Sequence, residues 1–265
     1  MWYDRRQIVA GMVGGIALLV LGQDGLARDR HVVTVGGYEF PPYVELDRAG
    51  GSPQGLTIDL LKLLNESQDK WDFQFFLTSP PRRYRDFAGG AFGMIAFESP
   101  DWGWTTSGQR FEASKVFFED SEVYVARKAE GRGQAYFDDF SGKRMAGILG
   151  YHYGFADFNA DSAVLKDKFA MMLVTDHAAS IEVVLRDRAD VAVVTKSYLL
   201  RYLSRNAAAR DQLLVSDKVD QIYRLQILTK PGEGPGSAEL NRLLEALEAD
   251  GRLPALFDKA GVIGS

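Results

Sequence analysis

The chain alternates short runs of β-branched and aromatic residues with segments in which leucines recur at helical spacing. Val32 to Val35 form the first apolar run, which predicts a buried strand. The leucines between residues 56 and 64 recur three and four apart, which predicts a helix with Asp59 in its first turn, where the helix dipole favours an anion. Residues 73–77 and 92–97 repeat the strand pattern. This order of strands and helices predicts a parallel sheet covered by helices.

A second unit of the same kind follows from residue 145 onward. Residues 145–149 and 191–194 predict strands, and between them lies a predicted helix that Thr175 or Asp176 caps. Two further apolar runs, residues 122–126 and 223–229, predict strands. A last leucine-rich helix is capped by Ser237 and ended by Gly251.

The loop between the first strand and the first helix is rich in aromatic residues. Tyr38, Phe40 and Tyr43 lie in it, and Pro41-Pro42 force the chain to turn. This loop leaves the carboxyl end of a strand, which is where open α/β sheets bind ligands. We therefore expect the loop to contribute to a binding site.

The first 27 residues have the pattern of a targeting segment. Arg5-Arg6 precede an apolar run from Ile8 to Leu21, and Gly25 and Ala27 place small residues at a cleavage site. The segment predicts a signal peptide, with an uncleaved N-terminal anchor as the alternative. We expect the general secretory route to the periplasm rather than the twin-arginine route, because paired arginines are common in any such segment.

Composition removes several classes of function. The net charge of −5, without a long run of either sign, argues against a nucleic-acid partner, which needs a basic face. The absence of cysteine excludes thiol catalysis, disulfides and an acylated cysteine. Three histidines leave little basis for a metal site, so we expect neither metal nor cofactor.

Several short motifs carry a family resemblance in the order in which they occur. Phe40-Pro41-Pro42-Tyr43 precedes a Gly-rich turn and the segment 55–60 (GLTIDL), and later come 188–194 (RADVAVV) and 243–257 (LLEALEADGRLPALF). In this order they resemble the family 3 extracellular solute-binding proteins, the type II periplasmic binding proteins that serve ABC importers of amino acids and similar small polar molecules.

The resemblance implies an α/β fold of two lobes, each a sheet flanked by helices, joined by two crossover strands. Lobe 1 would comprise residues 30–124 plus 222–265, and lobe 2 residues 125–221. The ligand would bind in the cleft between the lobes, and hinge closure around a ligand is the behaviour of such folds. The resemblance also implies a monomer whose partner is an ABC permease or a membrane sensor.

The sequence departs from the family at the positions that hold an α-amino acid. The Arg that family members carry shortly after the third strand is missing from residues 97–104 (FESPDWGW). Family members have an Asp after the lobe 2 strand at residues 191–194, where this chain has Thr195. They have Gly-Thr-Thr after the strand at residues 145–149, where this chain has Gly150-Tyr151-His152. Both anchors of a zwitterion are replaced, so we expect a ligand that is not an ordinary α-amino acid.

The candidate ligand contacts each have a structural alternative. The aromatic residues either contact ligand or pack within the lobes, the arginines either bind an anion or pair with surface acids, and Glu98 either holds a cation or forms a structural salt bridge. His152 is either a lobe 2 contact or a surface histidine. The candidates are Tyr38, Phe40, Tyr43, Arg82, Arg83, Phe97, Glu98, Trp102, Tyr151, His152, Tyr153 and Thr195.

Three functions follow from these patterns. The first is a periplasmic solute-binding protein, not an enzyme, that captures a small polar or aromatic-bearing ligand and undergoes closure. The second is a divergent accessory protein that docks on a partner without binding a small molecule. The third is a cleft lyase or dehydratase on the same scaffold, with Glu98 and His152 or Arg83 as the reacting groups. Against the third, the sequence has no nucleophile elbow, no metal-ligand spacing and no phosphate loop.

Overall fold

The computed structural model describes residues 29–47 and 49–259, so the predicted signal peptide lies outside the described residues. A continuous mixed sheet has the strand order β2-β1-β3-β9-β5-β8-β6-β7, with the short β4 also paired to β9. The strands are β1 His31–Gly37, β2 Trp71–Leu77, β3 Met94–Glu98, β4 Glu112–Ala113, β5 Phe118–Arg127, β6 Met145–Ile148, β7 Met172–Val174, β8 Val191–Thr195 and β9 Leu213–Thr229. The helices are α1 Leu56–Glu66, α2 Arg83–Ala88, α3 Ser162–Phe169, α4 His177–Leu185, α5 Lys196–Arg205, α6 Ala207–Gln212, α7 Ser237–Ala249 and α8 Arg252–Lys259.

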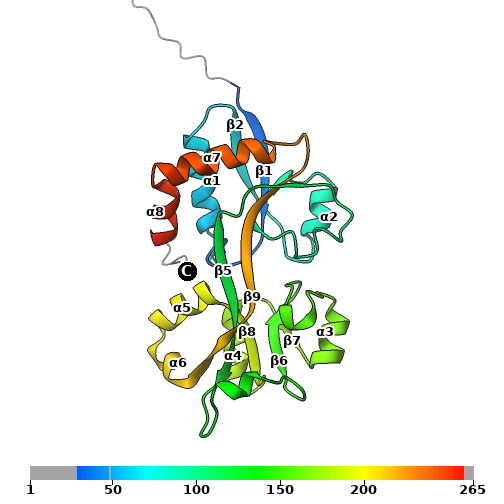
Figure 1. The fold of residues 1–265 in the computed structure, drawn as a ribbon, viewed down its shortest axis with the longest axis vertical. Helices are drawn as coiled ribbons and strands as arrows, with labels where there is room; N and C mark the ends of the chain where they lie inside the picture. The colour runs from blue at the N-terminus through cyan, green and yellow to red at the C-terminus, as the bar shows by residue number, and fades with distance from the viewer. Residues whose placement is uncertain (1–28, 48, 260–265) are drawn as a thin grey trace, which may run out of the picture.

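Two lobes lie at opposite ends of this sheet (Figure 1). In the first lobe, β1 pairs in parallel with both β2 and β3, as the alternation of strands and helices predicts. The helices α1, α7 and α8 lie together on this lobe, so the end of the described chain packs against its beginning (Figure 1). The buried leucines of α1 and α7 face the strand residues Val33 and Val35 in one apolar core.

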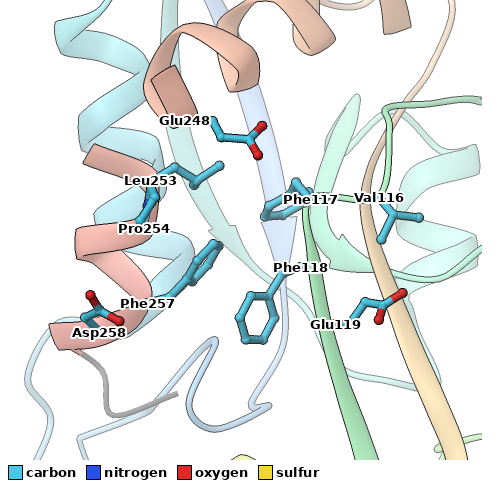
Figure 2. Close-up of a pocket in the computed structure, with 9 residues that line it drawn as sticks. All are labelled: Val116, Phe117, Phe118, Glu119, Glu248, Leu253, Pro254, Phe257 and Asp258. Atoms are coloured by element: carbon cyan, nitrogen blue, oxygen red, sulfur yellow. The ribbon is translucent and has the colours of Figure 1, made fainter. Parts of the chain in front are cut away.

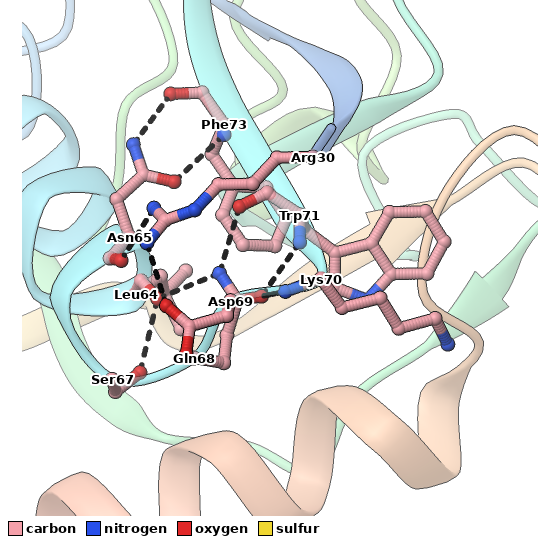
Figure 3. Close-up of polar contacts among 9 residues, drawn as sticks. All are labelled: Arg30, Leu64, Asn65, Ser67, Gln68, Asp69, Lys70, Trp71 and Phe73. Carbon is pink, nitrogen blue, oxygen red and sulfur yellow. Dashed lines mark hydrogen bonds and ion pairs between the residues drawn. The ribbon is translucent and has the colours of Figure 1, made fainter. Parts of the chain in front are cut away.

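The connection between α1 and β2 is fixed by side-chain amides (Figure 3). Asn65 donates to the Phe73 carbonyl at 3.0 Å and accepts from the Phe73 N–H at 2.8 Å. Gln68 accepts from the Trp71 N–H at 2.6 Å and donates to the Leu64 carbonyl at 3.1 Å. These bonds satisfy the backbone groups of the turn and set where β2 begins.

The strands β5 and β9 pair antiparallel and run between the two lobes (Figure 1). Both are longer than the apolar runs that predict them, because polar residues continue each strand. The fold is therefore the α/β architecture of two lobes joined by crossover strands that the sequence predicts.

The second lobe is built on β6, β7 and β8, with β6 parallel to both neighbours. Asp176 caps α4, as predicted, by accepting from the Ala179 N–H at 2.8 Å. Asp161 caps α3 in the same way, although the sequence pattern did not predict that helix. The predicted Ser237 cap is wrong, because Ser237 is the first residue of α7 and Gly236 is its N-cap.

The helix α2 begins at Arg83, after a turn that starts at Ser79. Ser79 does not cap it through its side chain; its carbonyl accepts from the Arg82 and Arg83 N–H groups at 2.9 and 3.0 Å in a preceding turn. Arg83 is therefore the first residue of α2, and its side chain is buried. Within the described part of the chain, no helix is long and apolar enough to cross a membrane.

Candidate functional site

Two of the hollows in the described part of the chain are compared as the candidate site. One of them, with a volume of about 560 Å³, is a groove on the first lobe (Figure 2). It lies between the start of β5 and the helices α7 and α8. Its lining residues are Val116, Phe117, Phe118, Glu119, Glu248, Leu253, Pro254, Phe257 and Asp258. No residue of the second lobe contributes to it.

The smaller hollow lies between the lobes and is formed by both of them. Its volume is about 10 Å³, close to the minimum that holds one water molecule. Its lining residues are Tyr38, Phe40, Arg83, Trp102, Gly150, Tyr151, His152 and Tyr223. Because buried charges and both lobes meet here, we take this cavity and its walls, called below the inter-lobe site, as the candidate functional site.

Aromatic rings fill most of the inter-lobe site. Phe40 of the loop after β1 packs edge-on against Tyr151 of the second lobe, with ring centroids 5.6 Å apart. Trp102 packs edge-on against Tyr223 of β9 at 4.8 Å. The Tyr151 hydroxyl donates across the lobes to the Glu39 carbonyl at 3.2 Å. Edge-to-face ring pairs add stabilisation beyond buried area, so the contact of Phe40 with Tyr151 favours the arrangement in which the lobes touch.

A buried ion pair forms one wall of the site. Arg83 Nε lies 3.3 Å from Glu98 Oε1, and the two side chains are only 2% and 1% exposed. Glu98 ends β3 after a bulge at which Phe97 adopts a left-handed φ of 55°. Burial raises the pKa of the Glu98 carboxyl, while the Arg83 guanidinium opposes that shift. Glu98 is not among the residues that line the cavity.

The Arg83 guanidinium also reaches backbone carbonyls of both lobes. Nη1 donates to the Pro80 carbonyl at 2.5 Å and to the Gly150 carbonyl at 3.4 Å. Nη2 donates to the Trp102 carbonyl at 3.3 Å and lies 3.4 Å from Nδ1 of His152. Pro80 and Trp102 belong to the first lobe, whereas Gly150 and His152 belong to the loop after β6 in the second.

His152 is neutral in this setting. Burial and the neighbouring Arg83 charge lower its pKa to about 3. Since a guanidinium only donates, Nδ1 of His152 accepts, and its proton resides on Nε2. Nε2 lies 3.5 Å from the Tyr84 hydroxyl, which itself donates to the Trp102 carbonyl.

A second buried carboxyl lies behind Trp102. Gln221 of β9 accepts from the Trp102 indole N–H at 2.9 Å and donates to Glu122 Oε2 at 2.7 Å and to the His152 carbonyl. Burial, followed by the nearby Asp220, raises the pKa of Glu122 well above its usual value. This shift favours the uncharged form of the Glu122 carboxyl.

The structure brings half of the predicted contacts to the cavity wall: Tyr38, Phe40, Arg83, Trp102, Tyr151 and His152. The others lie around it. Tyr43 donates to Asp120 at 2.7 Å, and Phe97 packs on Tyr43. The Tyr153 hydroxyl accepts from the nearby Ile148 N–H. Thr195 lies 2.9 Å from His177 Nε2 and 3.3 Å from the Tyr223 hydroxyl. Arg82 is exposed and forms an ion pair with Asp86 at 3.6 Å, as the structural alternative for the arginines predicts.

Sequence reasoning missed Tyr223 and Gly150. Tyr223 alternates with Gln221 and Leu225 on the buried side of β9, and that alternation does not tell which member reaches the cavity. Gly150 has a φ of +80°, and a Cβ built there would lie 2.9 Å from Pro81 Cγ. The glycine therefore permits the close approach of the two lobes.

Within residues 29–47 and 49–259, no group of three or more His, Asp or Glu side chains is placed to hold a metal ion. The inter-lobe site offers aromatic faces, tyrosine hydroxyls and a neutral imidazole. Its arginine and glutamate are already paired with each other. This arrangement is suited to holding a molecule by stacking and hydrogen bonds.

Comparisons with known proteins support this description of the fold. No protein-family model matches the chain, and no curated protein matches its sequence. The glutamate-bound ligand-binding core of GluR0 from Nostoc punctiforme is similar, with a TM-score of 0.66 and 16% identity over 87% of this chain and 100% of that one.

A histidine-bound substrate-binding protein of an ABC uptake transporter from Streptococcus pneumoniae has a TM-score of 0.69 at 18% identity, over 86% of this chain and 91% of that one. The ancestral amino-acid-binding protein AncCDT-1, a precursor of cyclohexadienyl dehydratase, has a TM-score of 0.63 at 17% identity, over 86% of this chain and 94% of that one. The chain thus has the two-lobe fold of the type II periplasmic binding proteins.

Proposed function

We propose that this protein is a solute-binding protein of the family 3 type, which captures a small molecule between its lobes. The observation that carries the proposal is the convergence of Tyr38, Phe40 and Trp102 of the first lobe with Tyr151 and His152 of the second on one cavity. Side chains that close on a common point from two hinged lobes are what a capture mechanism needs.

The solute is small, aromatic-bearing or polar, and without net charge. Arg83 and Glu98 pair with each other, His152 is neutral, and burial favours the uncharged form of Glu122. A zwitterionic amino acid would need an unpaired cation for its carboxylate and an unpaired anion for its ammonium, because burying an unpaired charge is costly. An uncharged ring that stacks on Phe40 or Trp102 meets no such cost.

The export and partner follow from the same proposal. The predicted signal peptide would carry the chain to the periplasm, and a permease of the ABC class or a membrane sensor would read the closed form. Binding would be followed by release of the solute unchanged, so the protein would not be an enzyme. The binding proteins to which the fold is similar support this coarse class.

One observation favours a second candidate, the accessory protein. With a cavity of about 10 Å³, the lobes are already in contact through their own side chains, and a solute enters only if they separate. A protein that closes on itself in this way would present one fixed surface to a partner.

A thermal-shift screen of the mature chain from Arg28 distinguishes the two. The probes are neutral aromatic amides, nucleobases, sugars, aromatic acids, polyamines and amino acids. A ligand that binds only the folded state at a hundredfold excess over its Kd stabilises it by about 2.7 kcal/mol. We expect a shift with an uncharged ring compound and none with amino acids. A flat response across all classes from folded protein would reject the solute-binding proposal in favour of the accessory protein.

A further inference from the structure

The Arg83 guanidinium is surrounded by aromatic rings, a carboxylate and hydrogen-bond acceptors, which are the groups that a protein uses to bind a cationic ligand. Its guanidinium carbon lies 4.4 Å from the ring centre of Tyr84 and 5.1 Å from that of Tyr38, both within cation–π range. The carboxylate of Glu98 lies against Nε, and three carbonyl oxygens and one imidazole nitrogen surround the two Nη atoms. We call this set of groups the guanidinium cage; its members are Tyr38, Pro80, Tyr84, Glu98, Trp102, Gly150 and His152.

The cage is matched to a planar cation with five donors. A guanidinium presents its N–H groups in a fixed fork, whereas an ammonium presents a compact point charge with three donors. Each Nη atom of Arg83 has two acceptors within 3.4 Å, and Nε lies 3.3 Å from Glu98 Oε1 without forming a hydrogen bond. Neither Nη atom is left to hold the carboxylate of an incoming solute.

The cage is completed only when the lobes are together. The first lobe supplies Glu98, both tyrosine rings and the carbonyls of Pro80 and Trp102. The second lobe supplies the Gly150 carbonyl and His152 Nδ1, both 3.4 Å from the guanidinium. Separation of the lobes would leave the guanidinium short of two acceptors.

We infer that the Arg83 guanidinium is a built-in occupant of the inter-lobe site, which fills a guanidinium cage formed by both lobes and holds them closed without a solute. Two consequences follow. A solute enters only when Arg83 releases Gly150 and His152, and a chain that lacks the Arg83 side chain has an empty site for a free guanidinium compound. The inference concerns the side chain itself and does not depend on which solute, if any, the protein captures.

The test is chemical rescue of Arg83→Ala by methylguanidinium, with Arg82→Ala as the matched control. Arg82 is the adjacent residue, but it is exposed and pairs with Asp86. The readouts are the melting temperature, titrated with millimolar methylguanidinium or methylammonium chloride, and the radius of gyration from X-ray scattering. We expect Arg83→Ala to melt lower and to be more extended than the wild type.

Methylguanidinium should restore both quantities in Arg83→Ala along a saturable curve, and methylammonium should not. It should leave the wild type and Arg82→Ala unchanged. If Arg83→Ala responds to methylguanidinium no more than Arg82→Ala does, the cage is not a binding site and the inference is wrong.

A second variant covers failure of Arg83→Ala to fold. Arg83→Met keeps an apolar stem but donates no hydrogen bond, so we expect it to fold with separated lobes. A radius of gyration equal to that of the wild type would show that Arg83 does not hold the lobes together. A flat solute screen combined with successful rescue would reject the proposed function and leave the cage intact.

Discussion

At the scale of single residues, the buried charges of the inter-lobe site are the most consequential groups. Arg83 and Glu98 are both almost completely buried, and each is the other's only oppositely charged partner among the described residues. Breaking a buried pair leaves one uncompensated charge, which destabilises a protein by about 3–5 kcal/mol. Replacing both members with uncharged groups is less damaging for the same reason.

Glu98→Gln should therefore lower the free energy of unfolding by about 3–5 kcal/mol, measured by urea denaturation. Adding Arg83→Met to it should restore part of that loss, because no charge is then left unpaired. The control is Asp69→Asn, which breaks the exposed pair with Arg30 and should change stability by about 0–1 kcal/mol. A loss from Glu98→Gln no larger than the loss from Asp69→Asn would contradict the importance of the buried pair.

Glu122 gives the protein a specific dependence on pH. The pKa of the Glu122 carboxyl is higher in the folded state than in the unfolded chain. At a pH above its unfolded pKa, the folded state therefore holds a proton that the unfolded state has lost. Stability is then highest at low pH on account of this group and falls as the pH rises, by up to about 1.4 kcal/mol per pH unit.

Glu122→Gln removes that proton exchange while it keeps an oxygen to accept from Gln221. As the pH rises above the usual glutamate pKa of 4.5, the variant should lose stability less steeply with pH than the wild type, in urea denaturation at each pH. Identical slopes for the two proteins would mean that Glu122 is ionised when folded.

At the scale of elements, the loop after β6 decides how closely the lobes approach. Gly150 has a φ of +80°, and a built Cβ meets Pro81 Cγ at 2.9 Å and Pro81 N at 3.0 Å. Gly142 also has a positive φ, of +72°, but a Cβ there meets nothing within 4 Å. The two glycines share the backbone strain of a substitution, but Gly150 is buried at the contact between the lobes and Gly142 is exposed.

Gly150→Ala should therefore lower the melting temperature more than Gly142→Ala and should increase the radius of gyration. Gly142→Ala should show only the cost of a left-handed alanine, about 1–2 kcal/mol, with an unchanged radius. Equal effects of the two variants on both readouts would show that the loop around Gly150 does not limit closure.

The predictability of these elements from sequence depends on how local their causes are. The strands β1, β6 and β8 and the helix α1 are apolar runs with a regular period, so the pattern alone finds them. The helix α5 has an apolar stripe, because Leu199 is buried and Tyr198 and Tyr202 pack on the same core, so its pattern was present in the sequence. The helix α6 buries only Ala209 and carries too little signal.

The site was predictable to the extent that its residues follow strand ends. Tyr38 and Phe40 come after β1, Trp102 after β3, and Tyr151 and His152 after β6. They could be identified because open α/β sheets bind ligands at the carboxyl ends of their strands. The partners of Arg83 could not be found in this way, because Gly150 lies 67 residues away along the chain and in the other lobe. Arg82 and Arg83 are adjacent in the sequence, and only the structure shows that Arg83, the first residue of α2, is buried while Arg82 is exposed.

At the scale of the whole molecule, closure is maintained by contacts that the chain makes with itself. The Arg83 cage, the Tyr151 bond to Glu39 and the ion pair of Arg201 with Glu45 at 2.6 Å all join the lobes. A solute must provide more binding energy than these contacts supply, since a ligand shifts an equilibrium only by its difference in affinity for the two forms. The proposed function therefore requires a solute that stacks well against the aromatic walls.

The most direct test is isothermal titration of the solute that gives the largest thermal shift, with Trp102→Phe and the control Trp71→Phe. Trp102 donates to Gln221 in the inter-lobe site, and Trp71 donates to Glu239 on the first lobe, far from the cavity lining. We expect one solute per chain and no change in Trp71→Phe. Trp102→Phe should bind about fivefold more weakly, because a weakened ring contact with the solute worth about 1 kcal/mol changes the affinity by that factor. No binding by any class of solute, or equal affinity in all three proteins, would contradict capture of a solute between the lobes.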